Sequence, residues 1–248
     1  MKVLIYNFFF MLALLTAWAI PAHAQTNNGL LLWWKFDEGS GVTAHDGSTN
    51  NNSGTLTNAP TWVTGRYGDA LKFVAASSQY VVSPSLGADP ASITLAAWIY
   101  SGTAGGVVFS ELGQVAINSG WHDSQIEVEA NGTVETCVWI GSLSCVKATT
   151  NLGFNQWHHV ALTYSSTTRR LIGYYDGQLG ASSASITKSA ANPGFFYAIG
   201  PIDATNDGNG AYFSGMIDDV RIYSRALTPG EIYELFENGA PNQMGSES

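Results

Sequence analysis

The sequence predicts an all-β protein, a two-sheet antiparallel β-sandwich or jelly roll with one short C-terminal helix. Short apolar or alternating segments recur along the chain, with turn-forming residues between them. The composition combines 27 Gly and 12% aromatic residues with only 12% charged residues, which is typical of strands joined by turns. About 224 residues follow an apolar leader, a length that suits one all-β domain.

The expected strands are short apolar or alternating runs bounded by turn signals. They occupy residues 29–36, 70–74, 80–82, 93–100, 157–164, 171–175, 195–200 and 212–223. Residues 37–58 are polar and rich in Gly, Asn, Ser and Thr, so we expect a loop there. We find no internal repeat and no sign of a second domain.

A hairpin is expected within residues 124–140. Asn131-Gly132 lies between two alternating runs and is the strongest short hairpin signal in the chain. A two-residue turn at this dipeptide would place Glu135 opposite Val128, on the face away from the neighbouring glutamates.

Cys137 and Cys145 are the only cysteines, and they flank a second expected turn at Gly141-Ser142. Hairpin partners can come close enough for a disulfide, and export would favour oxidation. No metal-binding spacing of His or Cys accompanies them. We therefore predict a disulfide between these two residues.

The segment 215–223 predicts a strand with one unusual residue. Strand alternation places Asp218 on the same face as Val220 and Ile222, turned toward the core. A carboxylate in such a position needs a hydrogen-bonding partner or a metal.

A capped helix is expected directly after this strand. Thr228 and Glu231 are three residues apart and form a capping box. An Asn-Gly pair at 238–239 would end the helix. Apolar side chains repeat between them at helical spacing, at Ile232, Leu235 and Phe236.

Residues 1–24 have the pattern of a secretory signal peptide, with one lysine, an apolar run and a small-x-small cleavage site. The alternative is an uncleaved membrane anchor, against which the proline and the cleavage site argue. We predict a mature domain at 25–241 and a flexible tail at 242–248. No other segment is apolar enough to cross a membrane, so we expect a secreted protein, periplasmic or extracellular, without membrane insertion.

The charge balance argues against several classes of partner. The chain has a formal net charge of −9, and removal of the leader takes away one lysine and no acid. An acidic protein repels nucleic acid and anionic membranes, so we expect neither as a partner. Neutral glycans and calcium remain compatible with this balance.

Seven segments together resemble the laminin-G-like jelly-roll domains of the concanavalin A-like lectin/glucanase superfamily. They occur in the order expected for that family and cover nearly the whole mature chain. They are FDEGSG at 36–41, DGSTNNNSGTL at 46–56, GDALKF at 68–73, ITLAAW at 93–98, WHHVALTY at 157–164, YYDG at 174–177 and the strand–helix segment at 215–239. Thr49 and Asn51 depart from the family, which often has glycine at these positions. The resemblance implies a concanavalin A-like jelly roll.

A calcium site is the metal site that the sequence supports best. The loop after Asp46 is rich in the carboxylate, amide and hydroxyl oxygens that calcium prefers. Related jelly rolls often hold a structural calcium between this loop and the Asp of the final strand. The resemblance therefore implies calcium bound by Asp46, Asn50 and Asp218. The alternative is an Asx-turn loop together with an aspartate that is hydrogen-bonded to the backbone.

Carbohydrate binding requires exposed aromatic rings with polar groups beside them. Trp34, Trp98 and Trp157 lie in strongly apolar strands and are expected in the core. Aromatic and polar residues near turns are the better ligand-binding candidates. These are Trp62, Trp121, Trp139, Tyr197, Asp203, Asn206, Asp207, Asn209 and Tyr212.

A polysaccharide-degrading enzyme is the alternative that the carboxylates suggest. Glu127 and Glu129 lie on one strand face, about 7 Å apart by strand rise. This separation overlaps the range of inverting glycosidases, but the third carboxylate of the family-16-type pattern E-x-D-x-x-E is missing. A solvated strand face explains the pair as well. His158 and His159 belong to the W-H-H segment, which the related domains use for packing and hydrogen bonding.

The sequence therefore predicts a secreted, non-catalytic binding domain with a glycan as the favoured ligand. A glycoside hydrolase or lyase on the same sandwich is the first alternative. An adhesion domain that binds a cell-surface protein is the second.

Overall fold

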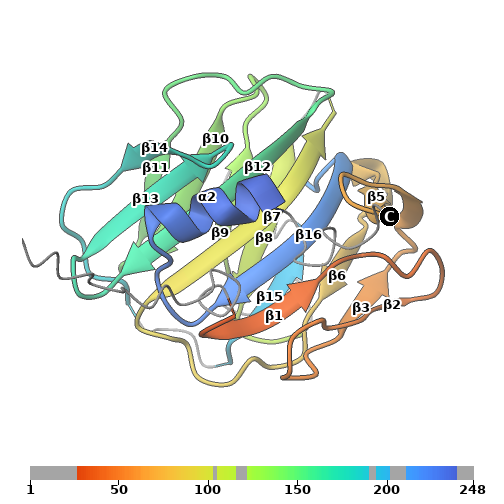
Figure 1. The fold of residues 1–248 in the computed structure, drawn as a ribbon, viewed down its shortest axis with the longest axis horizontal. Helices are drawn as coiled ribbons and strands as arrows, with labels where there is room; N and C mark the ends of the chain where they lie inside the picture. The colour runs from red at the N-terminus through yellow and green to blue at the C-terminus, as the bar shows by residue number, and fades with distance from the viewer. Residues whose placement is uncertain (1–26, 103–104, 116–121, 190–193, 202–210, 239–248) are drawn as a thin grey trace, which may run out of the picture.

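The computed structural model describes residues 27–102, 105–115, 122–189, 194–201 and 211–238. They form two antiparallel sheets that stack as a sandwich, which confirms the predicted fold class (Figure 1). Sheet A has the order β14 (Gln178–Ser182), β13 (Arg170–Tyr175), β12 (Trp157–Ser165), β7 (Ile93–Ser101), β16 (Gly215–Tyr223), β5 (Asp69–Phe73) and β4 (Thr61–Thr64), and β1 (Leu30–Trp34) also pairs with β16. Sheet B has the order β11 (Leu143–Lys147), β10 (Val134–Trp139), β9 (His122–Val128), β8 (Gly106–Leu112), β15 (Phe196–Ile199), β6 (Tyr80–Val82), β3 (Gly54–Thr57) and β2 (Thr43–Ala44).

The central strands of sheet A are buried on both faces. Along β7, Leu95, Ala97 and Ile99 point into the core between the sheets, whereas Ala96 and Trp98 point outward. The outward side is covered by the helix α2 (Pro229–Asn238), which lies across β13, β12 and β7 (Figure 1). This double burial explains why residues 93–100 carry no charge.

The helix α2 is fixed by its cap and by aromatic stacking. Thr228 and Glu231 form the predicted capping box, in which the Thr228 N–H donates to Glu231 at 2.8 Å and the Glu231 N–H donates to the Thr228 hydroxyl at 3.3 Å. Phe236 stacks on Trp98 with ring centroids 5.5 Å apart. The helix therefore closes the outer face of sheet A around Trp98.

A β-bulge in β16 changes the predicted face of Asp218. Asp219 has a positive φ of 50°, and the register between β16 and β7 shifts at this point. Because one extra residue reverses the alternation, Ile217 and Val220 both point into the core. Asp218 therefore lies on the outer face of sheet A, and not on the face of Val220 and Ile222 that simple alternation predicts.

The hairpin at Asn131-Gly132 is present with a longer turn than predicted. The Glu129 N–H donates to the Thr133 carbonyl, and Gly132 has a φ of 81°. These features fit a three-residue loop with a glycine in the left-handed region. The register consequently moves by one residue, and Glu135 pairs with Glu127.

Several short strands were not predicted. The segments β2, β3 and β4 have two to four residues each, too few to show an alternating pattern. The strand β14 lies at the edge of sheet A and is largely exposed. The strand β8 is entirely buried although it contains Ser110 and Glu111, which interrupt its apolar run.

No helix in the described part of the chain is long and apolar enough to cross a membrane. The predicted signal peptide, residues 1–24, and the predicted tail, 242–248, lie outside the described residues.

The predicted disulfide is present on the outer face of sheet B. Cys137 and Cys145 are direct partners in the β10–β11 hairpin, with Cα atoms 4.1 Å apart. The turn between the two strands contains Gly141, whose φ is 102°.

Reduction of the Cys137–Cys145 disulfide should lower the free energy of unfolding by about 2–3 kcal/mol, because a cross-link over so short a loop restricts the unfolded chain by about that amount. Urea unfolding with and without a phosphine reductant would measure the difference. The variant Cys137→Val/Cys145→Val is the control and should not respond to reductant. An identical wild-type midpoint under both conditions would contradict the expectation.

Candidate functional site

The loop that contains Asp46 is organised by hydrogen bonds to its own side chains. The Asp46 carboxylate accepts four hydrogen bonds, at 2.6 to 2.9 Å, from the N–H groups of Trp33, Ser48 and Asn52 and from the Ser48 hydroxyl. The Asn50 amide donates to two carbonyl oxygens of β1, at 2.8 and 3.1 Å. Both residues thus tie the loop to β1 by hydrogen bonds.

Asp218 is buried with one of its carboxylate oxygens unpartnered. Its Oδ2 accepts hydrogen bonds from the N–H groups of Arg66 at 2.8 Å and Tyr67 at 2.9 Å. Its Oδ1 is buried and has no partner, and the residue is only 1% exposed. Burial raises the pKa of Asp218 to about 8, and the nearby carboxylates of Asp219 and Asp37 add to this effect.

The carboxylates of Asp37 and Asp218 approach the same turn, residues 65–69. A Cβ on Gly65 would lie 2.6 Å from the Oδ2 of Asp218, and a Cβ on Gly68 would lie 2.1 Å from the Oδ1 of Asp37. The Asp37 carboxylate also accepts the N–H of Asp69 at 3.0 Å. Two glycines therefore make room for two carboxylates at one turn.

Asp37 also connects this turn with the Asp46 loop. A pocket of about 270 Å³ is lined by Lys35, Asp37, Glu38, His45, Asp46 and Gly47. The Oε2 of Glu38 is buried and has no hydrogen-bonding partner. Asp37 therefore lines one pocket with Asp46 and also approaches the turn that Asp218 contacts.

A metal site built from three His, Cys, Asp or Glu ligands is not evident in the described part of the chain. Among those residues, only Glu135, Cys137 and Cys145 have potential ligand atoms that all lie within 4.8 Å of one another. The two cysteines are disulfide-bonded, so this group cannot supply thiolate ligands.

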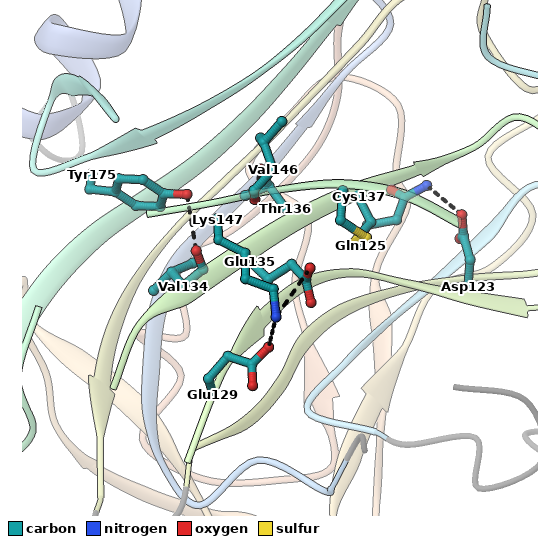
Figure 2. Close-up of a disulfide and its surroundings, with 11 residues drawn as sticks. Asp123, Gln125, Glu129, Val134, Glu135, Thr136, Cys137, Val146, Lys147 and Tyr175 are labelled. Carbon is teal, nitrogen blue, oxygen red and sulfur yellow. Dashed lines mark hydrogen bonds and ion pairs between the residues drawn. A yellow bond between two sulfur atoms is a disulfide. The ribbon is translucent and has the colours of Figure 1, made fainter. Parts of the chain in front are cut away.

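Three glutamates and a lysine lie on the outer face of sheet B. Glu127 and Glu135 are cross-strand partners. The Lys147 ammonium lies 2.8 Å from Glu129 and 3.5 Å from Glu135 (Figure 2). Burial raises the pKa of Glu135, the neighbouring Lys147 lowers it, and the Glu129 carboxylate raises it. Glu135 was not predicted to join this group, because a turn one residue shorter would place it on the opposite face.

The predicted ligand-binding aromatic residues are scattered. Trp62 is partly buried against the core and donates to the Gly41 carbonyl at 3.2 Å. Trp139 and Tyr212 are also partly exposed. Tyr197 is fully buried, and its hydroxyl donates to Gln125 at 2.6 Å, so the structure places this ring in the interior and not on the predicted surface. The remaining candidates, Trp121, Asp203, Asn206, Asp207 and Asn209, lie outside the described residues.

A surface row that the sequence analysis did not identify crosses sheet A. Lys72, Met216, Tyr100 and Trp157 are successive cross-strand partners on β5, β16, β7 and β12. All four are at least partly exposed. The rings of Tyr100 and Trp157 meet edge to face, with centroids 5.7 Å apart. We call these four residues the Tyr100 row. Trp157 was expected in the core, but its strand begins at this residue and leaves the side chain at the surface.

A pocket of about 450 Å³ lies at the Tyr100 row. Its lining combines apolar side chains with a few polar groups, the usual character of a small-ligand site. The lining residues are Val63, Lys72, Phe73, Val74, Tyr100, Gly102, Asn155, Ser214, Gly215 and Met216.

His158 and His159 are both held by contacts with other side chains of the domain. His158 contacts the Asp176 carboxylate through Nδ1 at 2.8 Å. His159 is buried beside Trp98 and Phe236, and burial lowers its pKa to about 3, with the Arg221 charge adding to the effect. A histidine that stays neutral and is covered by α2 does not reach a substrate.

Comparison with known proteins identifies a family for this fold. The family described as the concanavalin A-like lectin/glucanases superfamily matches residues 75–233. Comparison with curated protein sequences returns no match.

Solved structures with a similar fold include binding domains. Domain 4 of AbnA, an extracellular GH43 arabinanase from Geobacillus stearothermophilus solved with arabinotriose, is 18% identical with a TM-score of 0.58, covering 84% of this chain and 98% of that one. The binding domain of Paraclostridial Mosquitocidal Protein 1 is 15% identical with a TM-score of 0.64, covering 86% and 52%. A structure of botulinum neurotoxin type C, a protein whose cell entry depends on interaction with two ganglioside molecules, is 16% identical with a TM-score of 0.64 and the same coverage. The chain thus spans about half the length of the matched toxin structures.

The free energy of unfolding of the chelator-treated protein should fall as the pH rises from about 4 to about 8, through the carboxyl group of Asp218. A carboxyl group with a pKa of about 8 in the folded state and 3.8 in the unfolded state binds more protons when folded, so stability is lost across that interval. Asp218→Asn should remove this contribution, which we expect to be about 1 kcal/mol or more.

Urea unfolding of both proteins at pH 5 and pH 8 would measure the effect as a difference. The titration of His159 acts in the opposite direction but is common to both proteins, so it cancels. An equal pH dependence in the two proteins would contradict the expectation.

Proposed function

Because the chain belongs to the concanavalin A-like lectin/glucanases superfamily, we propose that it is a secreted, non-catalytic domain that binds carbohydrate. The observation that carries this proposal is the Tyr100 row, where two aromatic rings remain partly exposed beside a pocket with polar groups at its edge. The arabinotriose complex of the similar arabinanase domain supports a glycan as the type of ligand.

Binding would combine stacking with a small number of hydrogen bonds. Apolar faces of sugar rings pack on exposed aromatic side chains, while hydroxyl groups require donors and acceptors at the rim of the site. Asn155 and Ser214 supply such groups at the pocket. The β-sandwich holds the site in place, because the row is built on four paired strands.

The mature domain should bind at least one polysaccharide on a glycan array and should release neither reducing sugar nor unsaturated product from it. The described geometry gives a surface for stacking but ties Glu129 and Glu135 to Lys147. An array without hits would favour a protein partner and an adhesion role. Product release would favour the enzyme.

A hydrolase remains the second candidate, because three glutamates share one face of sheet B and the pKa of Glu135 is raised. If product were released, Glu135→Gln and Glu129→Gln should abolish the release. Glu237→Gln would serve as the control, since this exposed glutamate lies on α2, which covers the other sheet.

We further propose a structural calcium between the Asp46 loop and the final strand. The unpartnered, buried Oδ1 of Asp218 and the adjacent carboxylate of Asp37 fit a hard cation. Asp46 and Asn50, the predicted loop ligands, would either join these carboxylates or orient the loop around them. The ion would neutralise buried negative charge. It would also link the Asp46 loop, near the start of the domain, to β16, near its end.

Calcium should raise the melting temperature of the chelator-treated protein at pH 8, and this increase should disappear in Asp218→Asn. A ligand that binds only the folded state stabilises it, and the proposed site requires the ionised carboxylate. Differential scanning calorimetry with calcium and with magnesium would measure the shift. An equal increase in both proteins would contradict the assignment of Asp218, and no increase in either would contradict the calcium site itself.

A further inference from the structure

We propose that the Tyr100 row binds an acidic polysaccharide, with the Lys72 ammonium paired to the carboxylate of a uronic acid unit. This inference rests on the proposed glycan-binding function and specifies the site and the class of ligand.

The four side chains of the Tyr100 row form a continuous line across sheet A. Because Lys72, Met216, Tyr100 and Trp157 are direct cross-strand partners, their side chains point to the same face of sheet A. Neighbouring strands lie about 4.8 Å apart, so the row extends about 14 Å across the sheet. It is long enough for a short oligosaccharide, with aromatic rings at one end and a positive charge at the other.

The part of sheet A that carries the Tyr100 row is left open to solvent. The next outward row along the same strands consists of Asp218, Trp98 and His159. Phe236 of α2 covers that row, with ring centroids 5.5 Å from Trp98 and 6.3 Å from His159. The helix thus covers the aromatic rings of this row and leaves the rings of the Tyr100 row accessible.

The pocket at the Tyr100 row carries a positive charge. Its lining contains one charged residue, Lys72, and no carboxylate, in a chain with 19 acidic and 10 basic residues. Within the described part of the chain the other lysines are engaged. Lys147 pairs with Glu129, Lys188 pairs with Asp89, and Lys35 lies over the ring of Trp33.

Lys72 is exposed, and in the described part of the chain its ammonium makes no hydrogen bond or ion pair. A lysine in a pocket whose described lining contains no carboxylate presents a local positive site for an anion. Neutral sugars would not require this arrangement. A uronic acid unit provides a carboxylate for Lys72, and its sugar ring provides an apolar face for Tyr100.

The polar rim adds hydrogen-bonding groups without adding negative charge. Asn155 is exposed, has a positive φ of 59°, and is anchored by its N–H to the Ser101 carbonyl at 2.9 Å. Ser214 also lines the pocket, and its hydroxyl accepts the Ala75 N–H at 3.4 Å. An amide and a hydroxyl are suited to sugar hydroxyls.

The test uses polygalacturonate, alginate and hyaluronate, each with its carboxyl-reduced form, which keeps the backbone and removes the charge. Titration calorimetry with the mature domain should show binding to at least one of the three. The carboxyl-reduced form should bind roughly tenfold or more weakly, and higher salt should weaken binding of the acidic form.

Three variants locate the site. Lys72→Gln should weaken binding of the acidic polymer roughly tenfold or more and leave binding of the reduced polymer unchanged. Tyr100→Leu should weaken both, whereas Tyr100→Phe should retain the stacking. Arg169→Gln is the matched control, because it removes one exposed positive charge at a different pocket, lined also by Tyr164 and Lys188.

The outcomes separate this inference from the proposed function. Equal binding by wild type and Lys72→Gln, or an equal loss in Arg169→Gln, would overturn the assignment of the site. Binding of neutral polymers alone would overturn the ligand class but leave glycan binding intact. Failure of the wild type to bind any polysaccharide would overturn both. Since Lys72 is exposed, its replacement should keep the fold, which a thermal melt would verify.

Discussion

The pairing of β16 with its neighbours is the constraint on which the other features depend. This last strand pairs with β7 on one side and with β5 and β1 on the other, so it lies in the middle of sheet A. Its bulge at Asp219 decides which side chains point into the core and which point outward. Met216 belongs to the exposed Tyr100 row, and Asp218 belongs to the adjacent row that Phe236 of α2 covers. A change of register in this strand would move both.

The bulge also creates a buried charge network on the outer face of sheet A. Arg221 contacts the Asp219 carboxylate at 3.1 Å, and its guanidinium lies 4.6 Å from the centre of the Trp33 ring. Trp33 in turn donates through its indole N–H to Asp219. Charges in a site of this kind are tolerated because each has a partner. Asp218 differs from them, because one of its buried carboxylate oxygens has no hydrogen-bonding partner.

The fold class could be predicted from the sequence, because strand length, turn residues and the capping box are local properties. The capping box at Thr228 and the Cys137–Cys145 pairing followed from spacing alone. The face of Asp218 and the register of Glu135 could not be predicted in this way. Each depends on one additional residue, in a bulge or in a turn, whose backbone conformation only the paired strands reveal. The exposure of Trp157 depends on where β12 begins, and sequence patterns locate the ends of a strand poorly.

The pairing of β1 with β16 has a consequence for folding. Trp33 and Asp219 are 186 residues apart in sequence yet hydrogen-bonded in the structure. The middle of sheet A therefore cannot close until nearly the entire chain is available, since its central strand comes last. Contacts so distant in sequence slow folding, because a long loop must be closed before they form. Truncation before β16 would remove the central strand of sheet A. Loss of an edge strand such as β14 would leave that centre in place.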